Sequence, residues 1–318
     1  MTLLTAKVLD RWEEAPDIAS LRLVRADGGT LPPFSPGAHI DVYLPGGHVR
    51  QYSLCNGPNE KGDYRIAVLR APGSRGGSIA VHEQLHVGDI VTIGTPRNTF
   101  PLQHEQRSVL LAGGIGITPL LSMAKHLCEL DCDFSLHYCA RSPARTAFRE
   151  ELAASRFAHR VHYHFDDGPP EQKFSVEAAI GAPTPGVGIF VCGPSGFIEH
   201  VRRGAERGGF APDQVHAEYF GAEPQGAYGD RPFIIQIAST GQQIVVGAER
   251  TAVQALAAAG IEIMTSCEQG FCGTCVTRVL AGECDHRDIC LSAEEKERNA
   301  AFTPCCSRAS TPLLVLDL

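Results

Sequence analysis

The 318-residue sequence predicts a multi-domain chain, with an antiparallel β-barrel, then an α/β domain, then a small C-terminal domain rich in cysteine. Three observations predict this organisation. Short strand-like runs separated by turns rich in Gly and Pro fill the region before residue 100. Beyond residue 108, apolar strands alternate with helical stretches. Seven of the 12 cysteines lie beyond residue 260.

The N-terminal region has the pattern of a small antiparallel barrel. Its strands are expected at residues 20–24, 39–44, 50–54, 64–69 and 89–93. Arg50 and Tyr52 share one face of the third run, and Ser53 lies on the other. An arginine and a hydroxyl suit a phosphate, and a tyrosine ring suits a planar heterocycle. The same short pattern also fits an exposed arginine beside a half-buried tyrosine.

The middle region alternates strands with helices, as a parallel sheet requires. Strands are expected at residues 109–112, 134–138, 161–164 and 187–192, with helices after Thr118, Thr146, Ser175 and Pro194. Glycines 113, 114 and 116 end the first strand, and Cys192-Gly193-Pro194 ends the last. Such loops let a dinucleotide approach backbone N–H groups, although glycine-rich turns also arise for packing reasons.

The C-terminal region follows a polar stretch at residues 221–231 that is typical of a linker. Strands are expected at 233–237, 242–246 and 313–316, and a helix at 251–259. The domain boundaries are therefore expected at 1–103, 104–222, 223–231 (the linker) and 232–318.

Composition excludes several classes of protein. The formal net charge of −8 argues against nucleic acid as the main partner, because phosphate binding requires a basic surface. A hydrophobic share of 43% and a charged share of 20% are those of a globular chain. No uncharged apolar run has the length of a membrane span, and residues 1–16 lack the regions of a secretory signal. We expect a cytoplasmic protein without membrane partners, whose cysteines are ligands or thiols rather than disulfides.

Cys267, Cys272 and Cys275 form a C-x4-C-x2-C pattern, which is the spacing of a plant-type [2Fe–2S] centre with a distant fourth cysteine. A zinc site more often shows paired C-x2-C knuckles, and buried unreactive thiols are the remaining alternative. Spacing alone leaves the fourth ligand ambiguous, because Cys305 and Cys306 are neighbours and Cys284 and Cys290 are near. Cys284 and Cys290 follow Cys275 too soon for the usual long return. We choose Cys305 and interpret Cys306 as a packing residue.

Taken together, these motifs resemble the phthalate dioxygenase reductase family, which includes reductases of the vanillate demethylase type. The resemblance covers almost the whole chain, in the same order. It rests on R-x-Y-S-L at 50–54, G-G-S at 76–78, G-G-I-G-I-T-P at 113–119, C-G-P at 192–194, the cluster motif, C-x-S-R at 305–308 and L-V-L-D-L at 314–318. The resemblance implies an antiparallel β-barrel flavin domain, an α/β nucleotide-binding domain and a β-grasp [2Fe–2S] ferredoxin domain.

The resemblance also implies roles for individual residues. FMN would be bound by Arg50, Tyr52, Ser53, Ala67, Val68, Gly77 and Ser78. NADH would be received by Gly113, Gly114 and Thr118, with Cys192 near the reactive flavin nitrogen and Phe220 stacked on the ring. The cluster thiolates would be Cys267, Cys272, Cys275 and Cys305.

The implied activity is electron transfer from NADH through FMN and the [2Fe–2S] cluster to the terminal oxygenase component of an aromatic-ring Rieske system. Arg141 and Arg145 would suit the 2′-phosphate of NADPH, but we favour NADH. Two alternatives are the same relay serving a cytochrome P450 and a non-catalytic iron–sulfur redox sensor. Neither the substrate of the oxygenase nor the oligomeric state follows from the sequence.

Overall fold

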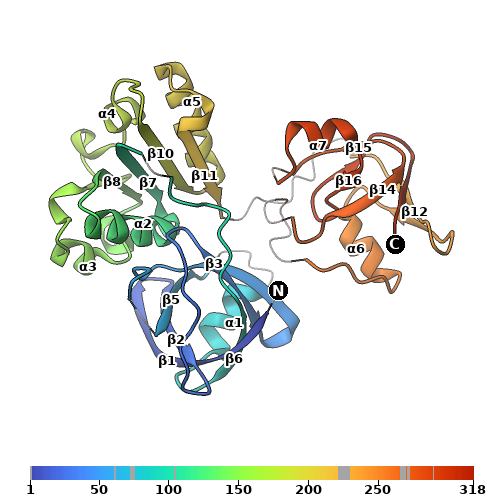
Figure 1. Ribbon diagram of the computed structural model, residues 1–318, viewed down its shortest axis with the longest axis horizontal. Helices are drawn as coiled ribbons and strands as arrows, with labels where there is room; N and C mark the ends of the chain where they lie inside the picture. The colour runs from blue at the N-terminus through green and yellow to red at the C-terminus, as the bar shows by residue number, and fades with distance from the viewer. Residues whose placement is uncertain are drawn as a thin grey trace. The chain divides into compact units, whose positions relative to one another are not determined.

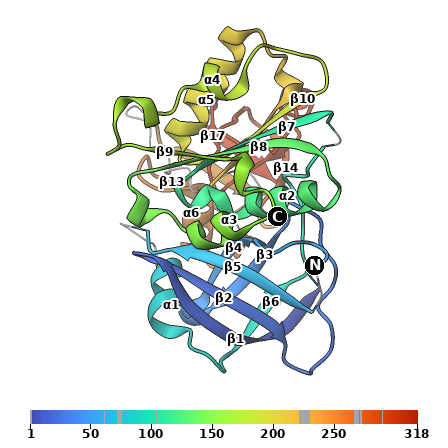
Figure 2. The ribbon, with the colours of Figure 1, turned by 90° about the vertical axis from the view of Figure 1, so that its left-hand side faces the viewer.

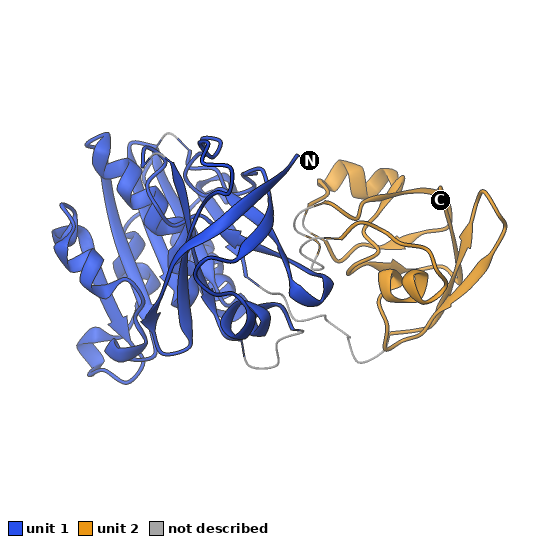
Figure 3. Cartoon of the chain, turned by 90° about the horizontal axis from the view of Figure 1, so that it is seen from below, with its two compact units in different colours: residues 1–220 blue, residues 221–318 orange. Residues whose placement is uncertain are grey.

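The computed structural model describes residues 2–60, 62–71, 76–103, 105–220, 230–265, 270, 273–288 and 290–318. The chain divides into two compact units, residues 1–220 and residues 221–318 (Figure 3). Among the described helices, none is both long enough and apolar enough to cross a membrane.

The first unit begins with a six-stranded antiparallel sheet (Figure 2). Its strands are β1 (Leu3–Ala15), β2 (Ile18–Arg25), β3 (His39–Leu44), β4 (His48–Ser53), β5 (Asp63–Leu69) and β6 (Ile90–Gly94), in the order β4-β3-β6-β1-β2-β5. Leu21, Ile40 and Ile66 point into a shared core. All five expected strands are confirmed, with ends that shift by up to two residues. The helix α1 (Gly77–Gln84), which contacts β3, β4 and β5, was not anticipated.

The long strand β1 was also missed, although it pairs with both β2 and β6. Its buried Ala6 and Val8 flank the exposed Lys7, and a register shift between Val8 and Asp10 then interrupts the alternation. The apolar residues of the strand therefore do not keep a regular period of two, and its sequence is weakly strand-like. Its place in the middle of the sheet depends on pairing with two partners.

A five-stranded parallel sheet completes the first unit (Figure 1). Its strands are β7 (Arg107–Gly113), β8 (Asp133–Ala140), β9 (Val161–Phe165), β10 (Val187–Gly193) and β11 (Val215–Tyr219), in the order β11-β10-β7-β8-β9. Its helices are α2 (Ile117–Glu129), α3 (Arg149–Ala154), α4 (Val176–Ile180) and α5 (Ser195–Gly208). The expected alternation of strands and helices is confirmed, and β11 is an addition.

Residue alternation along β7 decides how the helices are distributed. Leu110 and Ala112 pack in one cluster with residues of α2. Val109 and Leu111 pack in another cluster with residues of α4 and α5. The sheet is therefore covered on both faces, which explains why its strands are apolar on both sides.

The second unit is built on a five-stranded mixed sheet in the order β13-β12-β18-β14-β16, with a separate β15–β17 pair. The strands are β12 (Phe233–Ile237), β13 (Gln243–Val246), β14 (Thr277–Ala281), β15 (Cys284–Asp285), β16 (Ala301–Phe302), β17 (Arg308–Ala309) and β18 (Leu313–Leu316). The first strand runs parallel to the last, as Ile235 pairs with Leu314. Helix α6 (Ala252–Ala258) begins after a capping box formed by Thr251 and Gln254, and α7 (Ala293–Arg298) begins after Ser292.

The strands expected at 233–237 and 313–316 are confirmed with the same bounds, and the expected helix at 251–259 is one residue longer at each end than α6. Most of the linker expected at 223–231 lies outside the described residues. The proposed domain boundaries stay predictions.

Candidate functional site

The two glycine-bearing loops of the parallel sheet lie against each other at the carboxyl ends of β7 and β10. A Cβ atom on Gly116 would lie 2.2 Å from the carbonyl oxygen of Cys192, and one on Gly193 would lie 2.9 Å from the Cα atom of Gly113. Only glycine allows this backbone contact. The loop leads directly into α2, and the start of a helix is a position that suits an anionic ligand.

Of the other two residues predicted to receive NADH, Gly114 belongs to the same loop and Thr118 to the first turn of α2. Gly114 has a φ of +55°, and a Cβ atom on it would have no neighbour within 4 Å. Thr118 is buried, and its hydroxyl donates to the carbonyl oxygen of Ile115 at 3.1 Å. The hydroxyl therefore stabilises the first turn of α2, and the open side of the loop is at Gly114.

Cys192 and Glu218 are neighbours across the parallel strands β10 and β11. Cys192 is fully buried, Glu218 is half-buried with its Oε2 atom buried, and Glu218 forms a hydrogen bond with Ser53 of the barrel strand β4. The carboxyl oxygen Oε2 of Glu218 is buried without a hydrogen-bond partner among the described residues. Strand pairing and the Ser53 contact therefore bring together three residues that are far apart in the sequence.

Burial sets the charge state of this group of residues. It raises the pKa of Glu218 to about 8, and the hydrogen bond to Ser53 acts in the opposite direction. Burial, followed by the nearby Glu218, also raises the pKa of Cys192, so this side chain is a neutral thiol at pH 7. Glu218 therefore retains its proton at neutral pH and can donate a hydrogen bond. Sequence reasoning missed Glu218; the only signal was its position two residues before Phe220.

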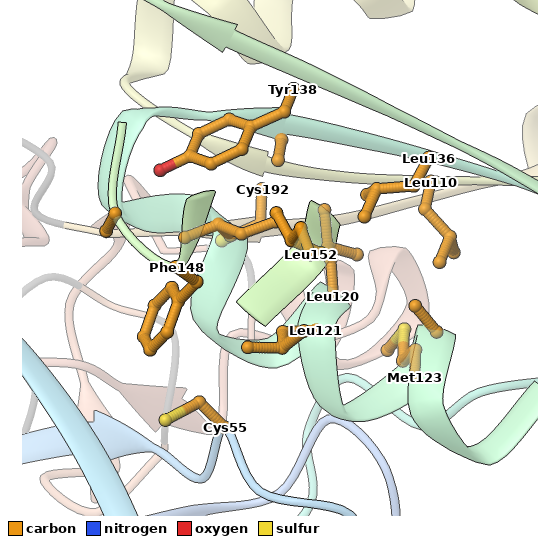
Figure 4. Close-up of a cluster of buried hydrophobic side chains, with 14 of the residues drawn as sticks. Cys55, Leu110, Leu120, Leu121, Met123, Leu136, Tyr138, Phe148, Leu152 and Cys192 are labelled. Carbon is orange, nitrogen blue, oxygen red and sulfur yellow. The ribbon is translucent and has the colours of Figure 1, made fainter. Parts of the chain in front are cut away.

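Cys192 and Phe220 both lie at the cluster of buried side chains that surrounds α2. Figure 4 shows Cys192 among these side chains, together with Tyr138 and Leu152. Phe220 is half-buried and packs against the edge of the same cluster, just after β11 ends at Tyr219. The structure therefore brings two of the predicted catalytic residues to one region.

The predicted phosphate contacts meet where β4 lies beside the start of α1. A Cβ atom on Gly77 would lie 2.6 Å from Cγ of Arg50, and one on Gly76 would lie 2.3 Å from Nε2 of His48. The glycines thus let the helix start sit directly against the arginine. An arginine at a helix N-terminus is a combination that suits a phosphate group.

Two other predicted flavin contacts, Tyr52 in β4 and Ser78 in α1, belong to the same two elements. Burial raises the pKa of Tyr52 well above its usual value, and its ring packs against the barrel core. The hydroxyl of Ser78 accepts a hydrogen bond from the backbone N–H of Ala71 at 3.2 Å. The roles of Tyr52 and Ser78 in binding FMN stay predictions. In the structure, Tyr52 contacts the barrel core and Ser78 contacts the backbone of Ala71.

Ala67 and Val68, predicted to lie along the flavin edge, are buried in β5. Ala67 packs in the cluster around α2, whereas Val68 packs in the barrel core. The carbonyl oxygen of Val68 lies 2.9 Å from Nε2 of His82 in α1. That carbonyl group therefore already has one partner within the protein.

Of the predicted cluster ligands, Cys275 and Cys305 are described, and Cys267 and Cys272 lie outside the described residues. The two described side chains are buried, with 3% and 4% of their surface exposed, and are hydrogen-bonded to each other. Cys306 is half-buried, and its sulfur lies 3.5 Å from the hydroxyl of Thr303. Two converging buried thiols are the donor atoms that a thiolate-bound iron–sulfur cluster requires, so the described part of the site fits that cofactor.

The two arginines considered for NADPH differ in their contacts. Arg145 forms an ion pair with Asp17, with 3.4 Å between Nη1 and Oδ2. Arg141 is exposed, and its carbonyl oxygen accepts a hydrogen bond from the backbone N–H of Asp167. Arg145 is therefore partly engaged by the barrel, which favours the choice of NADH.

Comparison with known protein families matches the middle and the C-terminal regions separately. Residues 110–203 match the family described as an oxidoreductase NAD-binding domain. Residues 235–310 match the family described as a 2Fe-2S iron-sulfur cluster binding domain. The second match includes all four predicted cluster ligands.

Relatives match the chain over its full length. It is 54% identical to a vanillate O-demethylase oxidoreductase of Pseudomonas sp. (strain HR199 / DSM 7063), covering 96% of each chain. It is similar to the solved structure of a phthalate dioxygenase reductase, with 37% identity, a TM-score of 0.79 and coverage of 99% and 98% of the two chains. It is also similar to 41% of an intact type IV self-sufficient cytochrome P450 monooxygenase, with 33% identity, a TM-score of 0.80 and 99% of this chain covered.

Proposed function

Because the chain belongs to the phthalate dioxygenase reductase family, we propose that it is the NADH-dependent reductase component of a multicomponent Rieske oxygenase or demethylase. In this function it passes electrons from NADH through FMN and a [2Fe–2S] cluster to the terminal oxygenase. The observation that carries the proposal is the match to a vanillate O-demethylase oxidoreductase over 96% of both chains, which spans every region of the relay.

The cofactors determine what the protein residues must do. When bound, FMN accepts two electrons together and releases them singly, and the cluster carries one electron at a time. Arg50, Gly77 and Ser78 would hold the flavin phosphate, with Tyr52 on the ring. Protonated Glu218 would offer a hydrogen bond beside the ring.

The nucleotide side of the site has its own set of residues. Gly113, Gly114 and Thr118 would receive the dinucleotide at the start of α2. Phe220 would cover the flavin where nicotinamide enters, and neutral Cys192 would line that entrance. Cys267, Cys272, Cys275 and Cys305 would bind the cluster.

The proposed partner is a protein electron acceptor. The chain from residue 223 onward carries 7 basic and 12 acidic residues, which favours docking on a basic patch of the oxygenase. A reducing compartment such as the cytoplasm suits a chain with 12 cysteines.

A cytochrome P450 is the second candidate acceptor. It is favoured by the similarity between this whole chain and part of a self-sufficient P450 monooxygenase. We rank it second because the relatives that this chain matches end to end include a vanillate O-demethylase oxidoreductase and a phthalate dioxygenase reductase.

One spectroscopic experiment tests the relay. The purified protein is expected to show flavin and iron–sulfur absorbance that both bleach when NADH is added without oxygen. Extraction should release FMN, and analysis should find about two irons per chain. Zinc without iron, or a spectrum that NADH leaves unchanged, would refute the proposal. NADH oxidation coupled to a purified Rieske oxygenase, compared with a P450, then identifies the acceptor.

A further inference from the structure

Asp288 is a buried carboxylate in the C-terminal unit, between β15 and α7. Its side chain has 0% of its surface exposed. Oδ1 accepts hydrogen bonds from the hydroxyls of Thr303 at 3.1 Å and Ser307 at 3.2 Å. Oδ2 accepts one from the backbone N–H of Leu291 at 3.0 Å and lies 3.6 Å from the sulfur of Cys290. A carboxylate held by this many donors is a fixed part of the fold.

The cationic side chain of Lys296 in α7 faces this carboxylate. Its ammonium group lies 3.9 Å from Oδ2 and also donates to the carbonyl oxygen of Asp288. His286 lies on the other side, with Nδ1 at 3.4 Å from Oδ1. Burial alone would raise the pKa of Asp288, but the Leu291 N–H group, Lys296 and Thr303 together hold it below its usual value. Asp288 is therefore an anion at neutral pH.

This anion lies against both chain segments that carry the predicted cluster ligands. Gly270 belongs to the loop between Cys267 and Cys272, and a Cβ atom there would lie 2.8 Å from the Cα atom of Asp288. The Gly270 carbonyl oxygen accepts a hydrogen bond from the backbone N–H of Cys290 at 3.1 Å. On the other side, Thr303 and Ser307 flank Cys305 at two residues' distance in the sequence.

The negative charge of Asp288 affects the pKa of a neighbouring thiol, that of Cys284. Burial, followed by this negative charge as the second cause, raises the pKa of the Cys284 thiol to about 11. In a buried environment of low dielectric constant, a fixed charge acts over several ångströms with little screening. An added electron at the nearby cluster would meet the same repulsion.

We propose that Asp288 sets the reduction potential of the cluster: its fixed negative charge lowers the potential, and Lys296 partly offsets it. The inference rests on the proposed [2Fe–2S] site. Reduction adds one electron to the cluster, so a nearby anion disfavours the reduced form and a nearby cation favours it. Asp288 acts on the cluster through its charge and its contacts with the two ligand-bearing segments.

The test measures the midpoint potential of the cluster in the full-length holoprotein by a redox titration followed with EPR. Asp288→Asn keeps the shape and removes the charge, and its potential is expected to be more positive. A tenfold change in the one-electron equilibrium corresponds to about 59 mV. Lys296→Gln removes the compensating charge, and its potential is expected to be more negative. Arg298→Gln is the matched control, because Arg298 lies on the same helix but pairs with exposed Glu294.

The opposite signs of the two shifts distinguish an electrostatic role from a structural one. A structural defect would move both variants in the same direction or broaden both EPR signals, and that result would overturn the inference, as would two unchanged potentials. Where D288N assembles no cluster, K296Q decides alone: a negative shift supports the inference, and no shift overturns it. Absence of a [2Fe–2S] signal from the wild-type protein refutes the proposed function itself, which is a separate outcome.

Discussion

At the scale of single residues, the contact between Ser53 and Glu218 is the feature that sequence reasoning did not anticipate. A carboxyl group with a pKa of about 8 is protonated at pH 7, so the site contains a neutral hydrogen-bond donor where the sequence shows an acid. The Oε2 atom of Glu218 is buried and has no hydrogen-bond partner among the described residues. Perturbed carboxyl groups of this kind mark functional sites more often than structural ones.

We predict that Glu218→Gln abolishes a pH dependence. Reduction of the bound flavin by NADH in the wild-type protein should change across pH 8, where Glu218 loses its proton. In the variant the rate should be flat between about pH 7 and 9, because the amide stays neutral. At pH 7 the rate should fall about fivefold or less, the equivalent of one ordinary hydrogen bond. Stopped-flow measurement of flavin absorbance gives both values.

The matched control for this prediction is Glu206→Gln, which changes an exposed acid on α5. Stability gives an independent check with a definite sign. The pKa of Glu218 is near 4.5 in the unfolded chain and about 8 in the folded protein. The contribution of Glu218 to the free energy of unfolding is therefore lost as the pH rises between these two values. E218Q should therefore lose less stability than the wild-type protein over that interval. An inflection near pH 8 that persists in E218Q would contradict the assignment.

At the scale of elements, the contact between the two glycine loops positions the nucleotide site. The loops come from β7 and β10, which are adjacent in the sheet, and their backbones touch because Gly116 and Gly193 lack side chains. Neighbouring parallel strands bring their carboxyl ends to one edge of the sheet, where ligands of open α/β sheets bind.

We predict that Gly116→Ala raises the KM for NADH and lowers the free energy of unfolding by about 2 kcal/mol or more. The reason is that the new methyl group would meet the rigid Cys192 carbonyl group at 2.2 Å, so the backbone must move. Steady-state kinetics and urea unfolding measure the two effects. Flavin content should stay unchanged, because the loop belongs to the nucleotide side.

Gly196→Ala is the control for this loop. Gly196 lies in α5, and a Cβ atom there has no neighbour within 4 Å. Alanine at a compatible helical position should stabilise the chain by up to about 1 kcal/mol without changing the KM. Equal effects of the two substitutions would mean that the contact with Cys192 does not constrain the loop.

At the scale of the whole molecule, one ion network joins the barrel to the α/β domain within the first unit. Arg65 of β5 pairs with Glu14 of β1 and with Glu151 of α3, and its guanidinium group lies 4.7 Å from the centre of the Phe148 ring. Lys125 of α2 pairs with the same Glu151 at 2.9 Å. The flavin and nucleotide contacts lie on different sides of this junction, so the network maintains their relative position.

We predict that Arg65→Met lowers the free energy of unfolding by about 3 kcal/mol, because Glu14, with 9% of its side chain exposed, would keep a buried and uncompensated charge. Flavin reduction should slow as the junction loosens. Arg70→Met is the control, since Arg70 and its partner Glu83 are half exposed and such surface pairs contribute about 0–1 kcal/mol. Urea unfolding measures the free energy of unfolding of both variants. Similar losses of this free energy in the two variants would refute a special role for Arg65.

The strand pattern of the chain was largely predictable because it is local. The runs at 39–44, 233–237 and 313–316 are apolar or alternating, and β3, β12 and β18 have these same bounds. Strand β1 was missed because charged side chains interrupt its apolar residues, and β11 because its five half-buried residues include the polar His216 and Glu218, so neighbouring strands decide their conformation. Helix α1 was missed because its two-glycine start is typical of a loop.

The sequence by itself determined the order of the regions, the family and the spacing of the predicted cluster cysteines, because these depend on residue type and distance along the chain. Only the tertiary structure decided that Glu218 is protonated beside Ser53, that Arg65 compensates Glu14, and that Asp288 is a buried anion behind the cluster loops. Burial and charge depend on which distant segments cover a side chain. That information is absent from local patterns and appears only when the strands and loops are packed together.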